Sequence, residues 1–89
     1  LDEDEPRPQK VILRFPSYFD LLLNEKTFHH TQKVKRNRSG EMELRMNVPV
    51  DHELVKWVMS WQDKAEVIQP KKLRDWLGAI GRRMARRYK

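Results

Sequence analysis

Apolar and polar residues alternate in four short segments of the chain, and this period-two pattern predicts β-strands. The segments are residues 10–15, 28–36, 42–50 and 65–69. The third alternates most cleanly, with Leu44 and Met46 on one face and Glu43 and Arg45 on the other. The second and third form a predicted hairpin, because Gly40 lies between them and glycine readily adopts a positive φ.

Three further segments have helical spacing: residues 18–26, 51–61 and 71–88. Asp51 is a predicted N-cap of the second helix. In the third helix the apolar residues fall within one arc and the basic residues lie opposite. The predicted order is β-α-β-β-α-β followed by a helix. We therefore expect an α+β fold, the ferredoxin-like split βαβ sandwich with an additional C-terminal helix.

The first two helices carry more apolar residues than one core-facing stripe requires. If Tyr18, Leu21 and Leu22 face the core, a second apolar edge remains, and the second helix has a similar flanking pair. These pairs are Phe19 with Leu23 and Val55 with Met59. A small core that needs all of them is one explanation. We favour the other, a dimer or interdomain interface that involves a second copy or a neighbouring domain.

Length and composition are typical of one small domain. The chain has 89 residues, 38% of them hydrophobic, and no cysteine. The segment 1–9 is acidic and contains Pro6 and Pro8, so we interpret it as an interdomain linker and 10–89 as the domain. Because the chain begins with Leu1 and shows neither a signal peptide nor a membrane-spanning run, we expect a piece of a larger protein in the cytoplasm.

The net charge of +6 is concentrated at one end, where residues 71–89 carry eight basic residues and only Asp75 as an acid. Such a cluster is typical of nucleic-acid binding, but a solvated helix face would look the same. Cations on the wet face of the sheet have the same two explanations, phosphate binding or solubility. The candidates from charge are Arg14, Lys33, Lys35, Arg45, Arg82, Arg83 and Arg86.

Nothing in the sequence predicts catalysis, a metal site or a cofactor. His29 and His30 are adjacent on a predicted strand, so their side chains are expected on opposite faces. The positions of the serines are explained by structural roles, as a helix cap, a turn residue and a helix residue, and not by nucleophilic catalysis. No glycine-rich phosphate loop is present in the sequence. The wet sheet face lacks the aromatic residues with which RNA recognition motifs stack bases.

Nearly the whole chain after the predicted linker resembles a known family, and the most specific elements lie in its second half. The residues that carry the resemblance are the Leu-Val-x-Trp helix at 54–57, the Glu-Val-Ile-x-Pro segment at 66–70, the Leu73-Arg74 pair and the terminal Arg87-Tyr88. The chain resembles the WCX domain, the C-terminal extension of bacterial WYL-domain transcription regulators. It departs from the family at Gln62, where glycine is usual.

The resemblance implies an upstream winged helix-turn-helix domain and WYL domain, and a role for this module in dimerisation. It also implies a site for a nucleic-acid effector such as single-stranded DNA, with Arg74 in the matching Leu-Arg element and Arg14 on the matching first strand. The alternative is a free-standing basic nucleic-acid-binding domain. An acylphosphatase-like enzyme is disfavoured, because no phosphate-cradling loop carries the needed Arg and Asn.

Overall fold

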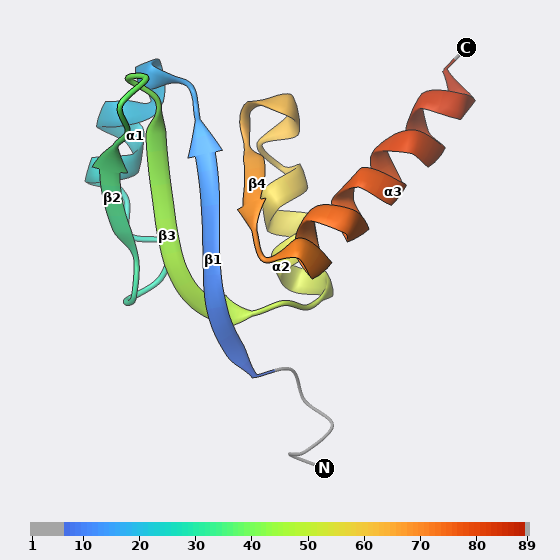
Figure 1. Ribbon diagram of the computed structural model, residues 1–89, viewed down its shortest axis with the longest axis horizontal. Coiled ribbons are helices and arrows are strands. Elements are labelled where there is room, and N and C mark those ends of the chain that lie inside the picture. Colours follow the sequence, from blue (N-terminus) through green and yellow to red (C-terminus); the bar gives the residue numbers. More distant parts are fainter. Residues whose placement is uncertain (1–6, 89) are drawn as a thin grey trace.

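The computed structural model describes residues 7–88, which form one antiparallel sheet with helices (Figure 1). The strands are β1 (Pro8–Phe15), β2 (Lys33–Arg36), β3 (Met42–Pro49) and β4 (Glu66–Gln69), in the sheet order β2-β3-β1-β4. The helices are α1 (Asp20–Glu25), α2 (His52–Met59) and α3 (Lys71–Arg87), with 3₁₀ turns η2 (Ser17–Phe19) and η3 (Gln62–Lys64). This order of elements and strands confirms the α+β, ferredoxin-like expectation.

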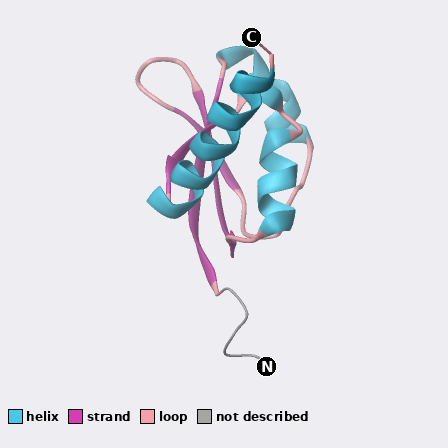
Figure 2. Cartoon of the chain, turned by 90° about the vertical axis from the view of Figure 1, so that its right-hand side faces the viewer, coloured by secondary structure: helices cyan, strands magenta, loops and turns pink. Residues whose placement is uncertain are grey.

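The two faces of the sheet differ in what they contact. Val11, Leu13 and Phe15 of β1 are buried together with the alternate residues of β3, and α1 and α2 pack over this face (Figure 2). The opposite face, called the open face below, carries Arg14 and Arg45, which alternate with these core residues along the same strands. One buried side and one wet side are common in antiparallel sheets.

Two predicted strand boundaries are wrong. β1 begins at Pro8, so the last two residues of the expected linker are paired with β3; residues 1–6 lie outside the described part of the chain. β2 is confined to Lys33–Arg36 because the residues before it form a side-chain-held turn. There the Oε1 atom of Gln32 accepts hydrogen bonds from the backbone of Phe28 at 2.6 Å and of His29 at 3.1 Å.

The expectation for the first helix is reversed. Tyr18 and Leu21 are 70% and 69% exposed, whereas Leu23 is completely buried. Tyr18 and Leu21 still share one side of this segment and Phe19 and Leu23 the other, as their spacing requires, but the second side packs on the sheet. Leu23 and Val55 both belong to the core of the chain itself, with Phe19 and Met59 packed against it. Leu23 and Val55 are therefore not part of a spare apolar surface, and the interface prediction is corrected for these two; Phe19 and Met59 remain partly exposed.

Other local predictions are confirmed. The carboxylate of Asp51 accepts a hydrogen bond from the backbone N–H of Leu54 at 2.9 Å, which caps α2. Gly40 has φ +86° in the β2–β3 turn. The sequence therefore determines these two element ends through local chemistry alone.

α3 is attached to the domain mainly by its first half. Leu73 is completely buried, and Trp76, Leu77 and Ile80 pack partly against the core. Every described residue from Gly81 onward is exposed. The helix accordingly extends past the β4 edge and away from the sheet (Figure 1).

Gln62, the position at which the sequence departs from the resembling family, has φ +61°. The left-handed region costs a residue with a Cβ roughly 1–2 kcal/mol, and glycine avoids this cost. The first residue of η3 thus keeps the conformation that suits glycine although glycine is absent.

We expect Gln62→Gly to raise the free energy of unfolding by about 0.5–1 kcal/mol, the relief of strain less the added entropy of the unfolded chain. Urea denaturation, monitored by tryptophan fluorescence, measures this free energy of unfolding. Lys64→Gly is the matched control, because no positive φ occurs at Lys64, and it should lower the same free energy. An equal loss in both variants would contradict the interpretation.

Candidate functional site

The open face of the sheet carries a row of alternating charges that crosses all four strands. The paired positions are Lys35 of β2, Glu43 of β3, Arg14 of β1 and Glu66 of β4. Directly paired residues in an antiparallel sheet have Cβ atoms roughly 4.5–5.5 Å apart, so opposite charges stabilise the row. The cations of this row therefore already have anionic neighbours within the domain.

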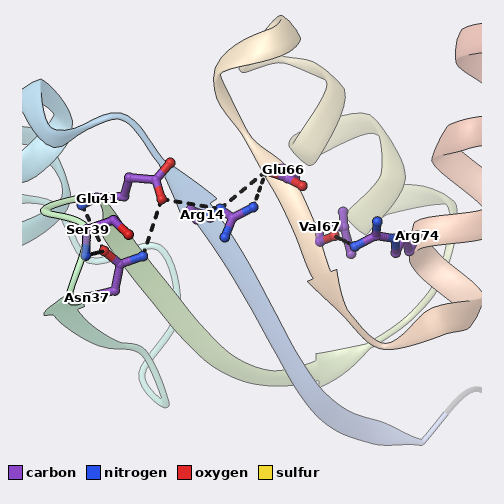
Figure 3. Close-up of polar contacts among 7 residues, drawn as sticks. All are labelled: Arg14, Asn37, Ser39, Glu41, Glu66, Val67 and Arg74. Atoms are coloured by element: carbon purple, nitrogen blue, oxygen red, sulfur yellow. Dashed lines mark hydrogen bonds and ion pairs between the residues drawn. The ribbon is translucent and has the colours of Figure 1, made fainter.

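Arg14 is at the centre of these contacts (Figure 3). Its guanidinium donates to the carboxylate of Glu66, with Nη2–Oε1 at 2.7 Å and Nε–Oε1 at 3.2 Å. Glu41 lies 3.7 Å away on the other side, and its backbone N–H donates to the side chain of Asn37. The hydrogen bond to Glu66 raises the pKa of Arg14 above its ordinary value. Arg14 thus links the β2–β3 turn to β4.

A second row on the open face is less neutralised. Lys33 pairs with Arg45, which in turn pairs with Ile12. Arg45 donates from Nη2 to Glu43 at 3.1 Å, while its buried Nε–H has no hydrogen-bond partner within the described residues. Two adjacent cations, of which only Arg45 contacts a carboxylate, make this corner the part of the open face best suited to an anion.

The other basic candidates lie on α3. Arg82, Arg83 and Arg86 are exposed, and none forms an ion pair with another residue of the described range 7–88. The sequence from Trp76 to Tyr88 contains four arginines and no acidic residue. Cations near a helix C-terminus also stabilise the helix through its dipole. This end of α3 is still the strongest uncompensated positive charge of the described chain.

The predicted candidates therefore do not form one continuous site. Arg14, Lys33, Lys35 and Arg45 share the open face, whereas the α3 arginines belong to a helix beyond the β4 edge (Figure 1). Arg74 lies between the two sets, and its Nη1 is 3.4 Å from the carbonyl oxygen of Val67 (Figure 3).

The neutralising carboxylates are what sequence reasoning missed. Strand alternation does place Glu43 on the same face as Arg45. The contribution of Glu66, however, depends on the pairing of β1 with β4 across 52 residues of sequence.

The histidine prediction is corrected in one respect. His29 and His30 precede β2 in a loop, and their rings stack with centroids 4.4 Å apart instead of lying on opposite faces of a strand. The Nδ1 atom of His29 is 2.7 Å from the hydroxyl of Thr31. Over residues 7–88, no three His, Cys, Asp or Glu side chains come together as a metal site. Nor is any described helix long and apolar enough to cross a membrane.

The contact between Arg14 and Glu66 should stabilise the domain modestly, because their side chains are 34% and 52% exposed and solvent screens the pair. In a double-mutant cycle with Arg14→Gln and Glu66→Gln, we expect a coupling free energy of about 0.5–1 kcal/mol. The helical pair Glu53–Lys56, at 3.7 Å and more exposed, is the control and should give less. Equal coupling free energies in the two cycles would show that the row of alternating charges stabilises the domain no more than an ordinary exposed ion pair does.

Comparison with known proteins agrees with this architecture. No curated protein matches the chain. The family model of the WCX domain matches residues 7–85, which covers every strand and helix except the last turn of α3. The chain is therefore a member of the WCX domain family.

Proposed function

We propose that this domain is the dimerisation and effector-sensing module of a WYL-type, DNA-binding transcription regulator, and that it contributes to binding a nucleic-acid effector such as single-stranded DNA. Membership of the WCX family supports a regulatory module associated with WYL domains. The proposal needs no catalytic group, and we propose that the domain is not an enzyme and uses no cofactor.

The observation that carries the nucleic-acid part is the arginine cluster of α3. Phosphate contacts supply most of the sequence-independent affinity for nucleic acids. A cation contributes most to this affinity when no carboxylate already neutralises it. Arg82, Arg83 and Arg86 meet that condition within the described residues, whereas Arg14 does not. We therefore assign the principal phosphate contacts to α3, and secondary ones to Lys33 and Arg45.

We expect the chain to bind a fluorescein-labelled single-stranded oligonucleotide with an affinity that falls as salt rises. Replacing Arg82, Arg83 and Arg86 by alanine should flatten the slope of log K against log salt by roughly 0.7 for each lost phosphate contact. Fluorescence anisotropy over a salt series measures this slope.

The triple variant Arg14→Ala, Lys33→Ala, Lys35→Ala is the control, because it removes the same formal charge from the open face. A larger loss of slope in this control would show that the principal phosphate contacts are on the sheet and not on α3. An unchanged slope in the α3 variant would show that its arginines form a solvated helix face and do not contact phosphates. Tight, sequence-selective binding by the isolated chain would favour the free-standing nucleic-acid-binding domain instead.

For dimerisation, we propose the surface formed by Tyr18 and Leu21 instead of the residues expected from the sequence. Both side chains are more than two-thirds exposed, and they lie three residues apart on η2 and α1. Paired apolar residues exposed at helical spacing are typical of protein contacts. We also propose that the missing WYL domain of the same chain and a second copy are the partners of the module.

Leu21→Ser should weaken self-association without destabilising the fold, since exposed substitutions usually change stability by less than about 0.5 kcal/mol. Sedimentation velocity over a concentration series measures association, and thermal unfolding measures stability. Met84→Ser is the control, because Met84 is another exposed apolar residue but lies on α3. If only the control dissociates the dimer, the interface belongs to α3.

A further inference from the structure

A groove of about 860 Å³ separates α3 from the body of the domain. One wall is built by the end of α2, by η3 and by β4, and the other by α3. Its apolar lining includes Val58, Met59, Ala65, Val67, Leu77 and Ile80. Small-molecule sites generally have volumes of roughly 300–1,000 Å³ and mostly apolar walls with a few polar groups. The groove has these properties, and the nucleic-acid proposal uses only Arg82 of its lining.

The backbone of α3 leaves the groove open. Gly78 and Gly81 both line it, and a Cβ added to Gly81 would have no atom within 4 Å. A Cβ added to Gly78 would lie 3.4 Å from Nη1 of Arg82, so the guanidinium of Arg82 lies close to the bare backbone of Gly78. The charged group of Arg82 therefore lies along this wall of the groove.

The groove lining contains three acidic and two basic residues, and the two kinds differ in whether they already have a partner of opposite charge. Its acidic residues have cationic neighbours: Asp75 is 2.6 Å from Lys71, Glu66 is 2.7 Å from Arg14, and Asp63 is 3.7 Å from Lys64.

The basic residues of the lining are Arg74 and Arg82. Arg74 makes only a long hydrogen bond of 3.4 Å, to a backbone oxygen, and Arg82 makes no ion pair within the described residues. The groove therefore combines apolar walls with two uncompensated guanidinium groups.

We infer that this groove binds a free amphipathic anion, a single acyl chain that ends in a carboxylate. The chain would lie against Met59, Val67 and Ile80, and the carboxylate would accept hydrogen bonds from Arg82, with Arg74 as the second cation. Guanidinium groups bind carboxylates with paired, charge-assisted hydrogen bonds. A polyanion is a poor occupant, because it would bury phosphates against apolar walls. The inference goes beyond the proposed function, since it concerns a small ligand in the groove, whose lining shares Arg82 with the proposed phosphate contacts.

The test is calorimetric titration of the chain with dodecanoate, kept below its micelle concentration. We expect saturable binding of one molecule per chain. Arg82→Gln should raise the Kd roughly fivefold, the loss of a partly exposed charged contact. Arg83→Gln is the matched control: it removes the same charge from the next residue of α3, which does not line the groove, and it should leave the Kd unchanged.

This pair of variants also separates the inference from the nucleic-acid proposal, because Arg82 and Arg83 should contribute comparably to phosphate binding. Equal effects of both variants on dodecanoate would reveal general charge attraction and would overturn the groove site.

Gly81→Leu is a second test, because leucine is a good helix former and would project into the open part of the groove. We expect unchanged or raised thermal stability together with at least a tenfold loss of dodecanoate affinity. Retained affinity in this variant would contradict the site. So would equal binding of a neutral dodecyl glycoside, which has no carboxylate, or binding only to vesicles of anionic lipid and not to the monomeric anion.

Discussion

The antiparallel pairing of β1 with β3 is the interaction on which the rest of the structure depends. It is the longest ladder of the sheet, from Pro8 opposite Pro49 to Phe15 opposite Met42. Its register decides which face of both central strands enters the core, and a shift by one residue would exchange the two faces. The same register sets Arg14 opposite Glu43, so one pairing determines both the apolar core and the charge pattern of the open face.

This arrangement separates two kinds of positive charge. On the open face, cations stand beside carboxylates of neighbouring strands, which favours strand pairing and limits the attraction of an outside anion. On α3, beyond Asp75, the arginines have no such neighbours in the sequence or among the described contacts. Because α3 is anchored through Leu73 and extends past the sheet, its arginines lie beyond the carboxylates that neutralise the cations of the open face.

Local sequence signals predicted the elements well where a single residue type controls them. Asp51 caps α2 through its own carboxylate, and Gly40 supplies the positive φ of the hairpin turn. The predictions failed where apolar spacing alone does not decide the outcome. Gln32 holds the backbone before β2 in a turn through its side chain, and packing on the sheet selects the side of α1 that carries Leu23, not Leu21, for the core. Neither event has a signature in hydrophobic periodicity.

The sequence by itself thus determined the α+β order of elements, the alternation that builds the core and the concentration of arginines at one end, because these depend on residue type and spacing. Only the tertiary structure decided which cations are neutralised, since Arg14 meets Glu66 across strands that are remote in sequence. The tertiary structure also decided the groove beside α3. Its walls come from α2, η3, β4 and α3, and its charge balance depends on distances between side chains that no local pattern encodes.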